Sequence, residues 1–211
     1  MPTLELKNVS YAYGKGKAVL RNISAELETG KMYAILGPSG SGKTTLLSLL
    51  GGLDVPIQGG VLFDGEDIAT KGLEHHRRNH VSLIFQSYNL IDYMTPAENV
   101  RLTAKLDAAP ILERLGLTKG ETQRNVLKLS GGQQQRVAIA RALASDAPVI
   151  LADEPTGNLD ADTAREITAV LKESAHGFGK CVVVVTHDCE AAKQADVVLE
   201  IRRGYLKKRE Y

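Results

Sequence analysis

One octapeptide, Gly37-Pro38-Ser39-Gly40-Ser41-Gly42-Lys43-Thr44, follows an apolar run over residues 32–36 and precedes a helix-like run over residues 45–50. A strand, a glycine-rich loop and a helix in this order form a P-loop. The glycines let the backbone curve around a phosphate chain with successive N–H groups pointing inward, and the helix adds its partly positive N-terminus. The stretch therefore predicts a phosphate site and the binding of a nucleoside triphosphate.

The positions of this loop have separate expected tasks. Lys43 would reach the β- and γ-phosphates, and the Thr44 hydroxyl would ligate Mg²⁺. A glycine-rich structural turn is the alternative, which the strand before the loop and the helix after it disfavour. The other nucleotide contacts predicted in this segment are Gly37, Ser39, Gly40, Ser41, Gly42 and Thr45.

Composition excludes several classes of protein. The 211 residues hold 26 Lys and Arg against 25 Asp and Glu, a net charge of +1, so the basic excess of a nucleic-acid-binding surface is missing. The longest apolar stretches, residues 147–152 and 181–185, are far shorter than a membrane span, and the N-terminus lacks the regions of a signal peptide. We expect a soluble, cytoplasmic chain with no nucleic-acid partner.

Cysteine and histidine usage adds little chemistry. Cys181 and Cys189 do not make a disulfide framework, and Cys181 opens a β-branched run as a small buried residue would. His75, His76 and His80 lie close together, but no carboxylate or thiol stands at ligand spacing. We expect these histidines to occupy a solvated polar turn.

The hydrophobic pattern changes along the chain. Residues 4–9 and 23–27 alternate, as half-buried antiparallel strands do, and Gly59-Gly60 and Asp64-Gly65 bound a hairpin-like segment at 61–63. Continuous apolar runs of the kind found in a parallel sheet, which is buried on both faces, occupy residues 81–85, 149–152 and 182–185. Helical signals, with stops at Gly116 and Pro148, occupy residues 96–100, 109–115 and 133–144.

These patterns predict an α/β fold. We expect a single domain over residues 1–211: a P-loop NTPase core with a parallel sheet, an N-terminal antiparallel β subdomain and an inserted α-helical subdomain. Residues 1–86 and 149–211 would form the core with its antiparallel subdomain, and residues 87–148 the helical one.

Two acids end the strand predicted at residues 149–152. Ligands of open α/β sheets bind beyond the carboxyl ends of the strands. Asp153 is therefore placed to hold Mg²⁺, which prefers carboxylates and retained waters, and Glu154 to accept a proton from an attacking water. Strand ends are often charged, so Asp153 and Glu154 indicate a catalytic site only because the chain also has a P-loop.

A second glycine-rich element, Leu129-Ser130-Gly131-Gly132-Gln133, precedes a helix. Ser130 with Gln133 three residues later reads as a capping box. A cap does not need two glycines, however, and Gly131 and Gly132 leave the helix N-terminus open to close approach, which suits a second anion site. One nucleotide would then have two phosphate-binding elements.

The pentapeptide at 129–133, with the P-loop before it and the apolar-Asp-Glu strand after it, resembles the ABC-type ATPases, the nucleotide-binding subunits of ABC transporters. The resemblance covers nearly the whole chain. It implies hydrolysis of ATP with Mg²⁺ by a homodimer that forms head to tail on ATP binding. Ser130, Gly131 and Gly132 of one copy, with Gln133 beside them, would close on the γ-phosphate held by the P-loop of the other.

The resemblance implies further site residues. Gln86 matches the glutamine that contacts Mg²⁺ and water and senses the membrane subunit, and His187 matches the switch histidine that contacts the γ-phosphate. Asn158-Leu159-Asp160 matches the loop joining the two active sites, although Asn158 and Asp160 could merely cap the next helix. Tyr13 matches the aromatic that stacks on adenine, with Tyr11 as its local competitor on the same face of an alternating strand.

Within the family, residues 50–54, 153–160 and 184–188 resemble the branch of macrolide, antimicrobial-peptide and lipoprotein exporters and the cell-division ATPase. The implied partners are an integral membrane permease subunit and an accessory or membrane-fusion subunit, with the chain peripheral on the inner face of the cell membrane. Residues 87–94 are a candidate groove for the permease, against the alternative of core packing. The stretch 100–126 is short for the family's helical subdomain.

Two other functions stay open. A regulatory ATPase that gates a membrane partner without transport, as in the cell-division relatives, shares all these motifs. A soluble ATPase acting on DNA or ribosomes is disfavoured, because its long coiled-coil insertion or second cassette does not fit into 211 residues and the chain has no heptad repeat.

Overall fold

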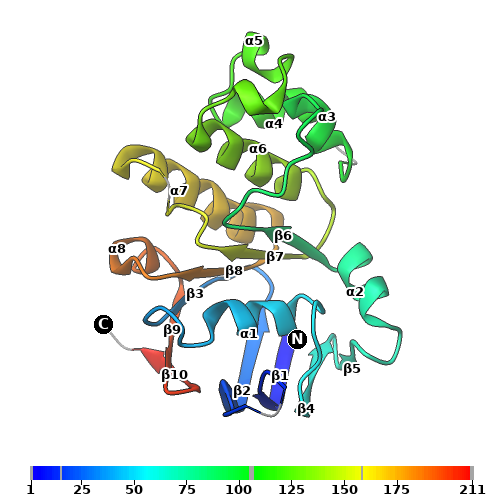
Figure 1. The fold of residues 1–211 in the computed structure, drawn as a ribbon, viewed down its shortest axis with the longest axis vertical. Coiled ribbons are helices and arrows are strands. Elements are labelled where there is room, and N and C mark those ends of the chain that lie inside the picture. Colours follow the sequence, from blue (N-terminus) through cyan, green and yellow to red (C-terminus); the bar gives the residue numbers. More distant parts are fainter. Residues whose placement is uncertain (1, 15, 105–106, 158, 210–211) are drawn as a thin grey trace.

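The computed structural model describes residues 2–14, 16–104, 107–157 and 159–209, and it places two sheets below a block of helices (Figure 1). The six-stranded sheet has the order β10-β9-β3-β8-β7-β6 and is parallel except for β10. Its strands are β3 (Met32–Leu36), β6 (Val81–Ile84), β7 (Val149–Asp153), β8 (Cys181–Thr186), β9 (Val197–Arg202) and β10 (Tyr205–Arg209).

The second sheet is antiparallel and has the order β2-β1-β4-β5. The turn between its last two strands is Asp64-Gly65, and both residues have positive φ, 48° and 84°, as the favoured two-residue hairpin turns require. Its strands are β1 (Pro2–Tyr11), β2 (Leu20–Glu28), β4 (Gln58–Phe63) and β5 (Glu66–Asp67).

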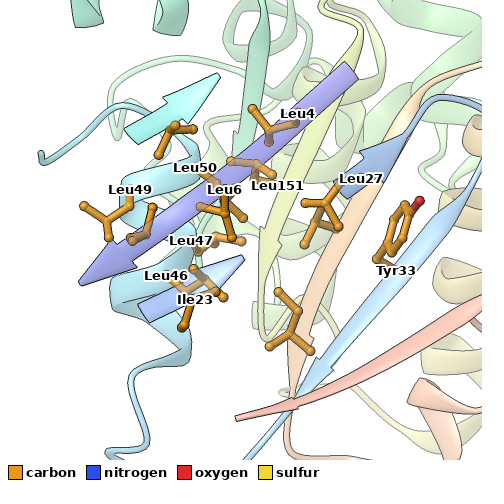
Figure 2. Packing of buried hydrophobic residues seen from close by; sticks show 14 of the residues in the cluster. Leu4, Leu6, Ile23, Leu27, Tyr33, Leu46, Leu47, Leu49, Leu50 and Leu151 are labelled. Carbon is orange, nitrogen blue, oxygen red and sulfur yellow. The ribbon is translucent and has the colours of Figure 1, made fainter. Parts of the chain in front are cut away.

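The inner parallel strands β3, β7 and β8 are apolar except at the last residues of β7 and β8, because both faces of their sheet are covered. In β8, Val183 and Val185 pack into the core shared with the antiparallel sheet, whereas Val182 and Val184 pack into the core beneath the helices. Helix α1 (Lys43–Leu50) lies in the first core, where Leu46 and Leu49 meet residues of β1 and β2 (Figure 2). The P-loop helix is thus held between the two sheets.

Helices cover the other face of the parallel sheet. The long helix α7 (Ala161–Phe178) packs beside β8, and α6 (Gly131–Leu143) contacts α3 (Pro96–Arg101), α4 (Ala108–Arg114) and β6. The remaining short helices are α2 (Leu73–Asn79), α5 (Lys119–Thr122), α8 (Cys189–Ala192) and the 3₁₀ turn η1 (Val126–Lys128). No helix in the described ranges is long and apolar enough to cross a bilayer.

The predicted α/β fold class is confirmed, and the strands and helices that were predicted differ from the observed ones by at most three residues at their ends. Cys181 is buried as expected, and burial raises the pKa of its thiol to about 12. The turn expected at His75, His76 and His80 is wrong. These residues belong to α2 and its C-cap, and His76 is buried because helical spacing turns it toward α1, where its Nε2 lies 3.0 Å from the Leu50 carbonyl oxygen.

Burial makes His76 a source of pH-dependent stability. Desolvation lowers the pKa of His76 in the fold, so protons bind the unfolded chain more readily. The contribution of His76 to stability is therefore fully present above the pKa of the unfolded chain, about 6.5, and it is lost as pH falls toward the lowered pKa of the fold. We expect the urea midpoint of the wild type to fall between about pH 7.5 and about pH 5.5 by more than that of His76→Gln, which has no ring to protonate.

The matched control for this prediction is His75→Gln, because His75 is the exposed neighbour on the same helix. His75→Gln is expected to keep the pH response of the wild type. Equal responses in His76→Gln and the wild type would assign the acid sensitivity to other groups.

Candidate nucleotide-binding site

The P-loop joins β3 to α1 in the geometry that a phosphate chain needs. Gly40 and Gly42 have φ of 73° and 102°, in the region that glycine adopts freely. A Cβ added at Gly37 would lie 2.5 Å from Ser41 Oγ and 2.9 Å from the Ile201 carbonyl oxygen, so the loop tolerates no side chain there. The Lys43 ammonium folds back over the loop and donates to the carbonyls of Gly37 at 2.8 Å and Pro38 at 3.3 Å.

Three observations fit the loop to a polyphosphate. Helix α1 has no side-chain cap at its N-terminus, so the N–H groups of its first turn are left for a ligand. Ser41 Oγ is buried and has no hydrogen-bond partner in the part of the chain that the structure describes. Lys43 is buried, and its ammonium donates to two neutral carbonyls. These groups would together bind a phosphate chain of several negative charges.

Asp153 and Thr44 meet beside the loop and form a candidate Mg²⁺ site. Asp153 ends β7 and is buried; burial raises the pKa of its carboxyl, while a hydrogen bond from the Thr44 side chain and the charge of Lys43 lower it. Gln86 is exposed in the turn that follows β6, whose Ile84 pairs with Ala152 of β7. All three side chains therefore belong to one edge of the sheet, and their oxygens are the kind that Mg²⁺ prefers.

Glu154 and His187 form a pair at the same edge, because β7 and β8 run side by side with Asp153 opposite Val185. Glu154 Oε2 lies 3.0 Å from His187 Nδ1 and accepts a 3.3 Å bond from the His187 backbone N–H. The Glu154 side chain is 12% exposed and that of His187 is 68% exposed. Glu154 has φ of 47°, an uncommon value for a residue with a side chain, and such values persist where the surrounding structure enforces them.

The two candidate tyrosines separate in the structure. Tyr11 is 6% exposed at the end of β1 and donates to the Asp54 carboxylate, which raises the pKa of its hydroxyl to about 12. Tyr13 lies beyond the strand and is 62% exposed, with its hydroxyl 2.8 Å from Thr45 Oγ1 in the first turn of α1. Only Tyr13 presents an open ring beside the P-loop, which favours it as the stacking residue.

The second glycine-rich element does not join this cluster. Ser130 caps α6 in a full capping box, which confirms the capping pattern read from the sequence. Helix α6 packs into the core beneath the helices, across the sheet from the core that holds α1. Ser130 and Gly131 are exposed. The Gln133 amide is occupied within the chain, since it also donates to Glu121 at 2.5 Å.

The predicted inter-site loop is described in part. Asp160 is the N-cap of α7 and accepts a 3.0 Å bond from the Thr163 N–H, which lowers the pKa of its carboxyl. Asn158 lies outside the described residues. Asp160 thus has at least the capping role that the sequence left open.

The sequence did not predict the close contact between Gly42 of the P-loop and the side chains of Val19 and Leu20. Val19 and Leu20 lie so close to Gly42 that an added Cβ would meet their side chains at 3.0 and 2.9 Å. The spacing of apolar residues in β2 gives no sign of this contact, because it joins two separate elements. It explains why the third glycine of the loop is needed.

A P-loop at the carboxyl edge of a parallel sheet, with two acids at the end of β7 in the same sheet, defines a nucleoside-triphosphate-hydrolysing protein. The chain belongs to the ABC transporter family, whose model matches residues 20–157. It is an ABC-type ATPase, the ATP-binding part of that family. The predicted family and enzyme class are confirmed.

Curated relatives are similar over nearly the whole chain. The chain is 42% identical over 215 residues to the uncharacterized ABC transporter ATP-binding protein YclH of Bacillus subtilis, covering 97% of this chain and 95% of that one. It is 43% identical over 221 residues to the macrolide export ATP-binding/permease protein MacB of Escherichia coli K12, covering 97% of this chain. The match spans 34% of MacB, about a third of its length.

Solved structures agree with the fold. The dimeric structure of MJ0796, a bacterial ABC transporter cassette, superposes with a TM-score of 0.87 at 37% identity, covering 99% of this chain and all of that one. MJ0796 in a post-hydrolysis state bound to ADP and Pi superposes with a TM-score of 0.86 at 36% identity and the same coverage.

Proposed function

We propose that the chain drives a separate membrane subunit by hydrolysing ATP in a head-to-tail dimer of two copies. The observation that carries this proposal is the separation of the two phosphate-binding elements. The helices that follow the two elements, α1 and α6, pack on opposite faces of the six-stranded sheet, and Ser130 and Gly131 are exposed at the N-terminus of α6. A second copy can supply to each P-loop what its own chain cannot, and dimeric MJ0796 structures are similar over the whole chain.

In each site the chain's own residues divide the work. The P-loop binds and orients the phosphates of ATP, and the exposed ring of Tyr13 stacks on the base. Thr44, Asp153 and Gln86 would hold Mg²⁺, which neutralises charge on the phosphate oxygens when bound. Glu154 accepts the proton of the attacking water, and the adjacent His187 orients the carboxylate.

The helical region would receive the membrane subunit. We propose residues 87–148 as the subdomain and residues 87–94 as part of its groove, where Tyr93 is 81% exposed. Hydrogen bonds from Asn125 Nδ2 to the Asp92 carbonyl and from the Val126 N–H to the Met94 carbonyl bring exposed Leu127 to this segment. Exposed aromatic and aliphatic side chains on one segment suit a protein interface.

The similarity to MacB favours an export or mechanotransmission role, with a drug, antimicrobial peptide or lipoprotein as cargo. A permease would hold the chain at the inner face of the cell membrane, and an accessory or membrane-fusion subunit could complete the assembly. Asp160, in the predicted inter-site loop, would lie at the contact between the two copies.

The proposal is tested by purifying the tagged chain from detergent-solubilised native membranes and identifying the integral membrane subunit bound to it. We expect the reconstituted complex in liposomes to hydrolyse ATP at a rate that differs from that of the chain alone by about tenfold, since closure of lids and domains controls many turnover rates. Recovery of the chain only from the soluble fraction, or an ATPase rate unaffected by the recovered subunit, would overturn the proposed coupling.

A further inference from the structure

We propose that Arg141 is a positioning residue for ATP hydrolysis. Its guanidinium holds the turn that contains Gln86 against α6, the helix whose N-cap is Ser130. The inference rests on the proposed function, because it connects two parts of one chain. Gln86 belongs to the Mg²⁺ side of the chain's own ATP site, and Ser130 and Gly131 would contribute to the site of the second copy.

The clamp is a fork of two hydrogen bonds. Arg141 Nη1 donates to the Asn89 carbonyl at 2.6 Å, and Nη2 donates to the Tyr88 carbonyl at 3.0 Å. The guanidinium is half-buried, and burial lowers its pKa, although an arginine stays charged at neutral pH. A planar fork that grips two successive carbonyls holds them in direction as well as in place.

The clamped turn has a backbone that needs support. Tyr88 and Asn89 have φ of 62° and 48°, two successive left-handed residues of which neither is glycine. This conformation is disfavoured for residues with a Cβ, and it persists where its surroundings hold it. Gln86 itself lies in this turn, because the Tyr88 N–H donates to the Phe85 carbonyl at 3.1 Å and so encloses residues 86 and 87. Whatever fixes residues 88 and 89 therefore fixes the direction in which Gln86 leaves β6.

Arg141 lies near the C-terminal end of α6, and the same turn also reaches the N-terminal end of that helix. A Cβ added at Gly131 would lie 3.2 Å from the Tyr88 hydroxyl oxygen, so the tyrosine side chain extends to the first turn of the helix. Arg141 lies in the last turn, and its carbonyl accepts a 2.8 Å bond from Thr103 Oγ1. The turn that contains Gln86 thus meets helix α6 at two points: it is hydrogen-bonded to the guanidinium of Arg141, and the Tyr88 side chain lies against the first turn.

This arrangement makes the position of Gln86 depend on that of α6. When Ser130 and Gly131 of α6 engage the second copy, the helix can shift only with the turn that Arg141 holds. Within the described ranges the side chain of Arg141 donates to Tyr88 and Asn89 and its carbonyl accepts from Thr103, so loss of the fork should free the turn and leave the P-loop, Asp153 and Glu154 in place. Binding of ATP should then survive, and the rate of the chemical step should fall.

The test compares Arg141→Ala, Gln86→Ala and the double variant by steady-state ATP hydrolysis, with rates normalised to the fraction of protein that binds a fluorescent ATP analogue. We expect Arg141→Ala to lower kcat by about 10–100-fold with KM within about twofold, since a displaced catalytic group costs turnover rather than binding. If Arg141 acts through Gln86, the double variant is no more than about threefold slower than Gln86→Ala alone.

Controls separate this role from general stability. Arg114→Ala removes an exposed arginine that pairs with Glu173 in the same helical region and is expected to keep kcat within about twofold, because exposed ion pairs contribute little. Arg141→Lys keeps the charge without the fork and is expected to lose part of kcat with the same dependence on Gln86. Normal turnover in Arg141→Ala, or losses that multiply in the double variant, would overturn the proposal, whereas Glu154→Gln tests the hydrolytic site independently.

Discussion

Glu154→Gln is expected to bind ATP as the wild type does and to lose turnover by about 10²–10⁴-fold, the usual contribution of a general base. The substitution keeps the shape of the side chain and removes its capacity to take a proton from water. Its position supports this outcome, because the carboxylate is nearly buried at the carboxyl edge of the sheet, beside Asp153 and 3.0 Å from His187 Nδ1. Phosphate release and ATP-analogue binding measure the two effects separately.

The same variant should reveal the dimer. Since ATP is bound and not consumed, the two copies stay closed, and light scattering should report twice the 22.8 kDa monomer mass with ATP and Mg²⁺ but not without them. Glu190→Gln is the matched control, because Glu190 is an exposed acid on α8, close in sequence to His187 and paired with Lys193. Turnover near the wild-type rate in Glu154→Gln would contradict the assignment of Glu154 as the general base.

Features that depend on neighbouring residues in the sequence could be predicted. The P-loop glycines were predictable because Gly40 and Gly42 adopt positive φ, which favours glycine. The parallel strands were predictable because burial on both faces leaves runs such as 182–185 without a polar residue. The capping box of Ser130 and Gln133 was readable from their spacing alone.

Contacts between distant segments were not predictable from one sequence. Tyr13 reaches Thr45 across 32 positions, and Arg141 reaches Tyr88 and Asn89 across more than 50. The residues near Glu154 give no sign of its left-handed backbone or of the bond from its N–H to the Val185 carbonyl on the neighbouring strand. The polar residues around His76 hide its burial, which follows from the helical period of α2.

Ser130→Arg is expected to leave ATP binding by the monomer intact and to abolish ATP-dependent dimerisation. Ser130 is exposed at the N-terminus of α6, which packs on the opposite face of the sheet from α1, so we expect a bulky cation there not to touch the chain's own nucleotide. It would instead meet the closing surface of the second copy with bulk and charge. In the Glu154→Gln background, light scattering should report only monomer at every ATP concentration, and cooperative hydrolysis should be lost in the parent background.

Ser130→Ala separates this steric effect from the loss of the helix cap. Both substitutions remove the Ser130 hydroxyl that accepts from the Gln133 N–H, which costs about 1 kcal/mol in stability. Ser130→Ala should therefore unfold at a similar denaturant concentration to Ser130→Arg while still forming the trapped dimer with ATP. If Ser130→Arg instead loses ATP binding as an isolated monomer, Ser130 contributes to the site of its own chain, and hydrolysis would not depend on the association of two copies.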